Sequence, residues 1–151
     1  LLSNTKRFRD AGWSALLIEA DDKLFDKLAT HATEKVRCHR HLVVGDDLER
    51  LLARAEAPRV LDFGVVDIDG QDFFAWDAMK VYQPRVMMVE HSGSDSSAVP
   101  PQGSAHGQAG FKEIVELGES KGYVALVRTA VNVVFARRDV WIATAPAGVA
   151  E

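Results

Sequence analysis

The sequence predicts a doubly wound α/β fold, in which helices cover both faces of a mostly parallel sheet. Apolar runs short enough to be strands alternate along the chain with longer stretches of helical periodicity. The run Phe63–Val66 is apolar throughout, as in a parallel strand buried on both faces, and acidic residues follow it directly. Two strands near the C-terminal end are separated by so few residues that they should form an antiparallel hairpin.

Strands and helices alternate in the first half of the chain. Gly12 is suited to end a helix, and Asp21 and Asp22 are suited to cap one. The elements predicted here are, in order, the end of a helix over Leu1–Ala11, a strand over Ser14–Glu19, a helix beginning at Asp21 and Asp22, a strand over Val36–Val44, a helix from Asp46 or Asp47 to Pro58, and a strand over Val60–Val66. Trp13, which precedes the first of these strands, is predicted to lie in the core.

The second half continues the alternation and adds one long loop. Ser92–Gly110 is rich in Ser, Gly and Pro, and a loop of this length in a compact domain is often a functional lid. The elements predicted here are a helix over Gln71–Lys80 with Trp76 on its packed face, a strand over Arg85–Glu90, a helix with Phe111, Ile114, Val115 and Gly118 on one face that ends at Gly122, and the hairpin strands Tyr123–Arg128 and Asn132–Arg137. We expect a domain over residues 1–140 and a loose tail over 141–151.

Composition restricts the class of protein. The chain has 151 residues, 47% of them apolar and 26% charged, which predicts one soluble domain with a substantial core. A formal net charge of −4 with mixed signs argues against a nucleic-acid partner. No apolar run approaches the length of a membrane span, so no membrane partner is expected. The single cysteine, Cys38, cannot form an internal disulfide, which favours a cytoplasmic location.

Four blocks of the sequence together resemble a known enzyme family. They begin at Gly12 (GWSALLIEAD), Asp67 (DIDGQD), Pro84 (PRVMMVE) and Gly122, where Gly-Tyr is followed by Asn132 and NVVFAR. In order and spacing they are similar to the FkbM-type family of S-adenosylmethionine-dependent methyltransferases. The resemblance implies a Rossmann-like sheet of seven strands whose last strand is antiparallel. It also implies S-adenosylmethionine as the cofactor and a small molecule as the acceptor.

The chain departs from this family at one point. In such enzymes the first strand lies in the middle of the sheet and ends in a Gly-rich turn beside the cofactor, whereas Leu1–Thr5 resembles the segment just after that turn. A central strand of about five residues contributes about ten ladder hydrogen bonds, and their loss would be comparable to the stability of a whole domain. We therefore expect the natural protein to have an upstream segment that supplies this strand.

Glu19 is the strongest candidate ligand for a cofactor. It ends the predicted strand Ser14–Glu19, and a carboxylate at this position can accept hydrogen bonds from both ribose hydroxyls. The resemblance gives it the same role, adenosine ribose binding. The same geometry would serve NAD, and Glu19 is also well placed to be a simple helix-capping or exposed acid.

Asp67, Asp69 and Asp72 form a second group of candidates. Three carboxylates so close together repel one another and favour a cation, a substrate group or helix N-terminal amides. Asp67, at the strand tip, is expected to face the methyl-transfer site as a cofactor-binding residue, a base or, with Asp69, a ligand for Mg²⁺. Helix capping by Asp69 and surface placement of Asp72 are the ordinary alternatives.

His91 is the predicted catalytic base. It directly follows the strand Arg85–Glu90, and an imidazole that titrates near neutrality suits the removal of a hydroxyl proton. The alternative is an imidazole that only begins the long loop. His106, within that loop, is a weaker candidate.

The function expected from these residues is methyl transfer from S-adenosylmethionine to a hydroxyl of a small molecule or sugar. One alternative is an NAD-binding enzyme that shares the sheet and Glu19. Another is a degenerate methyltransferase fold that acts as an interaction module, which the absent glycine turn keeps open. The acceptor, the metal dependence and the oligomeric state cannot be read from the sequence.

Overall fold

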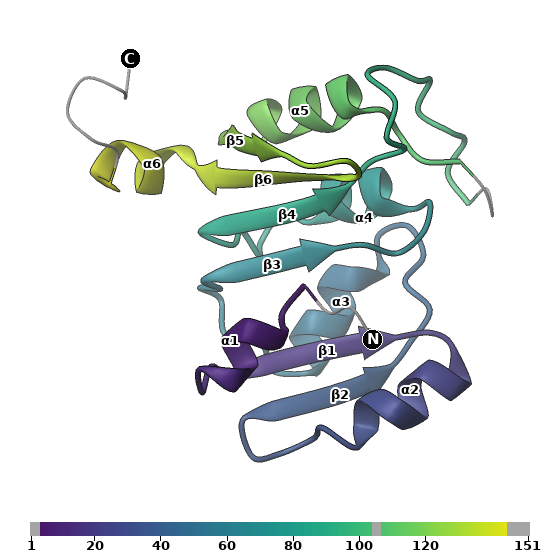
Figure 1. The fold of residues 1–151 in the computed structure, drawn as a ribbon, viewed down its shortest axis with the longest axis vertical. Coiled ribbons are helices and arrows are strands. Elements are labelled where there is room, and N and C mark those ends of the chain that lie inside the picture. Colours follow the sequence, from purple (N-terminus) through teal and green to yellow (C-terminus); the bar gives the residue numbers. More distant parts are fainter. Residues whose placement is uncertain (1–3, 104–106, 145–151) are drawn as a thin grey trace. The chain divides into compact units, whose positions relative to one another are not determined.

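The structure is a computed structural model that describes residues 4–103 and 107–144, and its fold is mixed α/β (Figure 1). The chain divides into two compact units between Val43 and Val44, and each is described by itself below. His106 and residues 145–151 lie outside the described part of the chain. The α/β class predicted from the alternating pattern is confirmed.

The first unit contains a two-stranded parallel sheet. Its elements are α1 (Lys6–Asp10), β1 (Ala15–Glu19), α2 (Asp22–Ala29) and β2 (Val36–Arg40). The sheet register runs from Ala15 opposite Val36 to Glu19 opposite Arg40. The predicted cap of α2 is confirmed, because the Asp21 carboxylate accepts a hydrogen bond from the Leu24 amide at 2.9 Å.

The second unit contains a four-stranded mixed sheet in the order β3-β4-β6-β5. Its elements are α3 (Asp47–Arg54), β3 (Phe63–Val66), α4 (Asp72–Ala78), β4 (Val86–Glu90), α5 (Phe111–Ser120), β5 (Tyr123–Arg128), β6 (Asn132–Arg137) and α6 (Arg138–Thr144). β3 and β4 are parallel, whereas β6 runs antiparallel to both β4 and β5. The predicted C-terminal hairpin is confirmed, and its second strand lies between β4 and β5 (Figure 1).

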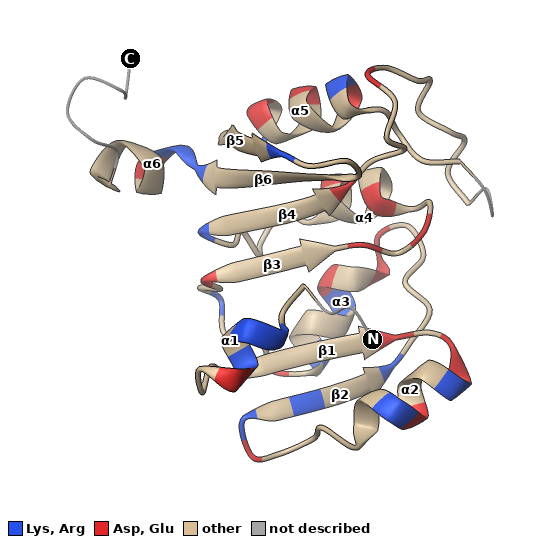
Figure 2. Ribbon diagram, viewed as in Figure 1, with Lys and Arg blue, Asp and Glu red and all other residues tan. Residues whose placement is uncertain are grey.

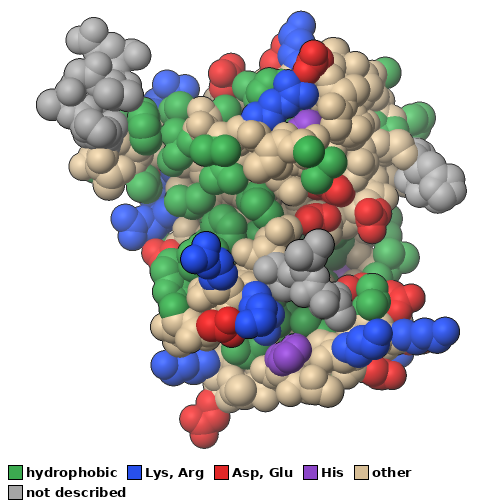
Figure 3. Space-filling view, viewed as in Figure 1, with side chains coloured by type: hydrophobic (Ala, Val, Ile, Leu, Met, Phe, Trp, Pro, Cys, Tyr) green, Lys and Arg blue, Asp and Glu red, His purple; other side chains and the backbone are tan. Residues whose placement is uncertain are grey.

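The core of the second unit lies on one face of this sheet. Trp76 of α4 packs against Tyr123 and Phe135, with ring centroids 5.6 and 4.9 Å away, and all three rings are buried. Gly118 of α5 lets that helix approach, since a methyl group there would lie 2.6 Å from the Phe135 ring. The core placement predicted for Trp76 is confirmed. Over the four-stranded sheet, hydrophobic side chains also reach the surface in Figure 3.

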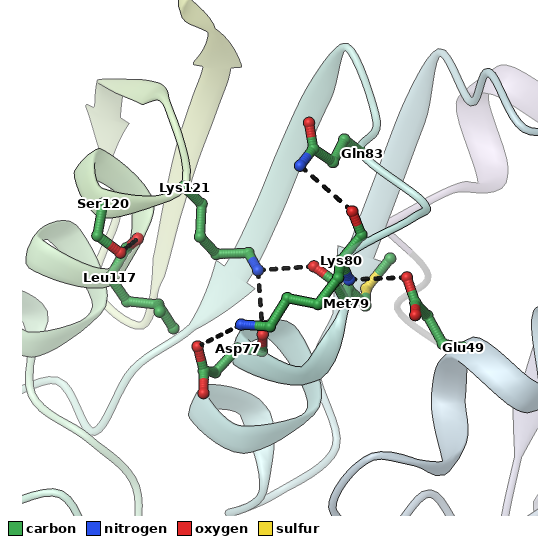
Figure 4. Close-up of polar contacts among 8 residues, drawn as sticks. All are labelled: Glu49, Asp77, Met79, Lys80, Gln83, Leu117, Ser120 and Lys121. Atoms are coloured by element: carbon green, nitrogen blue, oxygen red, sulfur yellow. Dashed lines mark hydrogen bonds and ion pairs between the residues drawn. The ribbon is translucent and has the colours of Figure 1, made fainter.

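Two charged side chains connect three helices of the second unit (Figure 4). One oxygen of Glu49, on α3, accepts the backbone N–H groups of Lys80, Val81 and Tyr82, which follow α4. Lys121, at the end of α5, donates from Nζ to the carbonyls of Asp77 and Met79 at 3.1 and 2.7 Å. These contacts satisfy backbone groups at the end of α4 that have no partner within the helix.

Several predicted boundaries differ from those in the structure. α3 ends at Arg54 rather than at Pro58, because the chain turns at Glu56, which has a positive φ of 50°. β2 ends at Arg40, four residues before the predicted end. Residues 141–144 belong to α6, so the prediction of a loose tail is wrong for them. Trp13 is 43% exposed and its ring contacts that of Phe8 at a tilt of 47°, which corrects its predicted core position.

Candidate functional site

The turn between β3 and α4 is closed by the Asp72 carboxylate. Its two oxygens accept the backbone N–H groups of Ile68 and Gly70 at 2.9 and 3.0 Å. Asp69 and Gly70 within the turn have positive φ angles of 55° and 127°. Asp72 is only 2% exposed, because these hydrogen bonds hold its carboxylate inside the turn. The surface placement considered for Asp72 is therefore wrong.

The same turn leaves Asp67 and Asp69 on the surface, at the carboxyl end of β3. Asp69 does not cap α4, since the capping position belongs to Gln71. In Figure 2 acidic residues follow β3 and occupy the end of β4. Within residues 4–103 and 107–144, no group of three or more His, Cys, Asp or Glu side chains is arranged to hold a metal ion. The geometry thus gives no support to the predicted Mg²⁺ ligands Asp67 and Asp69.

Glu90, the last residue of β4, is the most perturbed acid near this turn. Burial, as the largest cause, and the negative charges of Asp67, Asp72 and Asp69 together raise the pKa of its carboxyl to about 7. Gln108 of the long loop donates its side-chain N–H to Glu90 and partly offsets these effects. Glu90 is half-buried and can both hold and release a proton near neutral pH.

Asn132 lies directly beside Glu90 on the neighbouring strand. The two residues are paired in the antiparallel register of β4 and β6, so their side chains extend from the same face of the sheet. The Asn132 side-chain oxygen is buried and has no hydrogen-bond partner among the described residues. Glu90 and Asn132 therefore form a polar pair at the end of the sheet.

The long loop lies next to the β3–α4 turn. The Gly103 backbone N–H donates to the Gln71 side-chain oxygen at 3.1 Å, and a methyl group on Gly70 would lie 3.4 Å from the Gly107 carbonyl. Together with the contact between Gln108 and Glu90, these interactions join the loop to both acidic strand ends. This placement fits a loop that controls access to the acids, as its length and composition predict.

His91 is poorly placed to act as the predicted base. Its side chain is fully buried, and its Nδ1 atom accepts the Gly93 backbone N–H at 3.0 Å. Burial lowers the pKa of the imidazole, so the ring is held in its neutral form. Because Nδ1 is already an acceptor, the ring proton of the neutral form is on Nε2, and neither nitrogen is available to take a proton from a substrate. This geometry argues against the catalytic role predicted for His91 and favours Glu90.

In the first unit, Glu19 ends β1 as predicted and is half-buried. Its Oε1 atom accepts the backbone N–H groups of Ala20 and Asp21 at 2.8 and 2.9 Å. These bonds fix the carboxylate at the strand end through one oxygen, and among the described residues no hydrogen bond to Oε2 is seen. The ribose-binding role of Glu19 stays a prediction.

Sequence reasoning missed the importance of three residues: Glu90, Gln108 and Asn132. Glu90 was recognisable as a strand-terminal acid, and the two-residue period places it on the opposite face from His91. The contact from Gln108 depends on how an aperiodic loop folds back, for which the sequence contains no signal. Asn132 was recognisable as part of the last block of the resemblance and as a strand residue close to a turn, but its pairing with Glu90 was not.

Comparisons with family models, with curated proteins and with solved structures found no match. In the described part of the chain, every helix is too short or too polar to cross a membrane.

Proposed function

We propose that this protein transfers a methyl group from S-adenosylmethionine to a hydroxyl oxygen of a small molecule or sugar. The observation that carries the proposal is Glu90, an acid with a pKa of about 7 at the end of β4, beside the acidic end of the parallel strand β3. In open α/β sheets, ligands bind outside the carboxyl ends of parallel strands. The antiparallel last strand β6 further supports the Rossmann-like methyltransferase type that the sequence resemblance implies.

The residues at the sheet end fit the chemistry of this cofactor. S-adenosylmethionine supplies the methyl group as a sulfonium cation, and the exposed carboxylates of Asp67 and Asp69 lower the energy of a positive charge near them. If this cofactor binds, its methyl would move from sulfur to the acceptor oxygen, the S–C bond would break to leave neutral S-adenosylhomocysteine, and the hydroxyl proton would have to leave. Glu90 takes that proton in its carboxylate form and later releases it to water.

Asp67 differs from Glu90 in exposure and therefore in its role. It is exposed at the tip of β3 and contributes negative charge that raises the Glu90 pKa. Its proposed role is to favour the cationic cofactor and to keep Glu90 basic enough to accept a proton. Glu19, which belongs to the first unit, is proposed separately as a ligand for ribose hydroxyls at its own strand end.

Thermal unfolding with added ligand tests the choice of cofactor. We expect S-adenosylhomocysteine to raise Tm and NAD to leave it unchanged, since only a ligand that binds the native state stabilises it. Stabilisation by NAD alone would instead indicate a dinucleotide-dependent enzyme. Stabilisation by neither would favour an interaction module and contradict the proposal.

A pair of variants tests the role of Glu19. Glu19→Gln keeps an acceptor for the Ala20 and Asp21 amides but removes the charge that strengthens a bond to ribose. A hydrogen bond to a charged group contributes about 1.5–3 kcal/mol, so S-adenosylhomocysteine should bind about tenfold to 100-fold more weakly. Glu34→Gln removes one charge from an exposed position of the same unit and is the matched control. Equal affinity in the two variants would exclude the ribose role.

A further inference from the structure

His91 is a fully buried imidazole that the proposed reaction does not use. It follows β4 directly and lies at the start of the long loop. Its ring contacts that of Phe111, the first residue of α5, edge to face at 5.7 Å. Its backbone N–H donates to the Val131 carbonyl in the β5–β6 turn at 2.8 Å. The side chain therefore lies where the loop, α5 and the hairpin meet.

The hydrogen bonds of the ring require its neutral form. The Gly93 backbone N–H donates to Nδ1, which must be unprotonated to accept it. Protonation would place a second N–H at Nδ1, directly facing the N–H of Gly93. Nε2 is buried without a hydrogen bond to the described residues, although the backbone of Thr129 lies close enough to favour a charged ring. An imidazolium would therefore lose its one ring hydrogen bond in a buried position.

Two charged groups face the ring, from β5 and from the loop. Arg128 lies over the Phe111 ring at 4.2 Å and pairs with Asp95 at 2.6 Å. Burial is the main cause that lowers the His91 pKa; the Arg128 charge lowers it further, and the Asp95 charge opposes both. The surroundings as a whole favour the neutral ring.

The turn that His91 holds also fixes both arms of the loop. Next to Gly93, the Ser92 N–H donates to the Ala109 carbonyl at 2.9 Å, and the Phe111 N–H donates to the Ser94 carbonyl at 3.0 Å. Ala109 adjoins Gln108, whose side chain contacts Glu90. Loss of the Gly93 turn would therefore loosen the segment that covers Glu90.

We propose that His91 is a pH-sensitive lock on the loop. The neutral ring holds residues 92–97 and 107–110 against the end of β4, and protonation of the ring releases them together with the contact between Gln108 and Glu90. The regulated feature is access to the acidic strand ends. The lock would control this access whichever ligand binds there.

Amide hydrogen exchange tests the lock in the full chain. Between about pH 7.5 and about pH 5, the exchange of residues 92–97 and 107–110, corrected for the intrinsic effect of pH, should increase about tenfold or more. Exchange in β6 serves as the internal reference and should not change. Unchanged loop exchange, or loop and β6 opening together, would overturn the proposal.

The variant His91→Asn separates the lock from other titrating groups. The Asn oxygen can accept from the Gly93 N–H in place of Nδ1 and does not titrate, so the acid-induced opening should disappear. Glu90→Gln is the matched control, because Glu90 also titrates near neutral pH; opening should persist in it. The reverse pattern, with opening lost only in Glu90→Gln, would assign the switch to Glu90.

Nitrogen NMR of the wild-type imidazole provides a test that needs no variant. At neutral pH we expect Nδ1 to be unprotonated and Nε2 to carry the proton. The Gly93 amide signal should shift with the same midpoint as the ring. A ring protonated at Nδ1 at neutral pH, or different midpoints, would contradict the lock.

Discussion

Replacement of Glu90 by Gln should stabilise the protein in alkaline solution but not in acid. The side chain is half-buried beside three other acids, and its pKa is raised from 4.5 to about 7, first by burial and then by the charges of Asp67, Asp72 and Asp69. Because the folded-state pKa is raised, protonated Glu90 contributes to the free energy of unfolding, and this contribution is complete below pH 4.5. It is lost as the pH rises through about 7.

The magnitude follows from this shift. A change from 4.5 to about 7 is equivalent to about 3 kcal/mol. Because Glu90 is only half-buried, solvent screens part of the interaction, and roughly 1 to 2 kcal/mol is the realistic expectation. Gln is close to Glu in shape and keeps an oxygen that can accept from Gln108, so the substitution removes mainly the charge.

Urea unfolding of both proteins at about pH 5 and about pH 8.5 measures the effect. The advantage of Glu90→Gln over wild type should increase by roughly 1 to 2 kcal/mol between the two conditions. Any effect of His91 occurs in both proteins and cancels. Glu119→Gln removes one charge from the exposed surface of α5 and controls for net charge. A stability difference that does not change with pH would show that burial and the neighbouring acids do not raise the Glu90 pKa.

Three further substitutions test the packing around the site by chemical denaturation. Gly118→Ala should destabilise the fold by about 1 kcal/mol net, because contact with Phe135 and Trp76 costs about 1–3 kcal/mol and outweighs a gain of about 1 kcal/mol in helix propensity; a stabilised variant would contradict this packing. Glu49→Gln should cost about 1–2 kcal/mol near neutral pH, since burial raises the Glu49 pKa but three backbone donors outweigh it and lower the pKa overall. That cost should vanish as the pH falls below 4.5 and through the lowered pKa, because the wild-type carboxylate is then protonated. If Glu49→Gln stayed less stable than wild type in acid, the charge of Glu49 would not be the cause. Tyr123→Phe should cost about 1 kcal/mol, because the buried hydroxyl donates to the Pro84 carbonyl at 2.8 Å, and an unchanged stability would contradict that bond.

The hairpin was the most predictable part of the fold. Tyr123–Arg128 and Asn132–Arg137 have the predicted bounds, because β-branched and aromatic residues make up half of each strand and a short turn joins them. The end of α3 was less predictable. Pro58 is a clear stop signal, but the helix ends earlier, where Glu56 adopts a positive φ. Glu rarely adopts this conformation, so the sequence does not indicate a turn there.

The candidate site could be located from the sequence, but its residues could not be ranked. Acids at the ends of two apolar strands are visible in the sequence, and the structure places Asp67 and Glu90 at the ends of paired strands. The choice of His91 as the base rested on its ordinary pKa. Burial and neighbouring charge make Glu90 a better candidate for the base than His91, since they raise the pKa of Glu90 and lower that of His91. These effects depend on tertiary structure and are not encoded in the local pattern.

We expect the acidic ends of β3 and β4 to bind a sulfonium cofactor, and calorimetric titration of wild type and Asp67→Asn measures this binding. Two charges near the surface interact by about 1–4 kcal/mol at contact, so loss of the Asp67 charge should weaken binding of the cation S-adenosylmethionine by about tenfold. Binding of S-adenosylhomocysteine, which lacks the sulfonium charge, should weaken much less. If neither compound bound the wild type, or if Asp67→Asn lost affinity equally for both, the acidic strand ends would not be a sulfonium site.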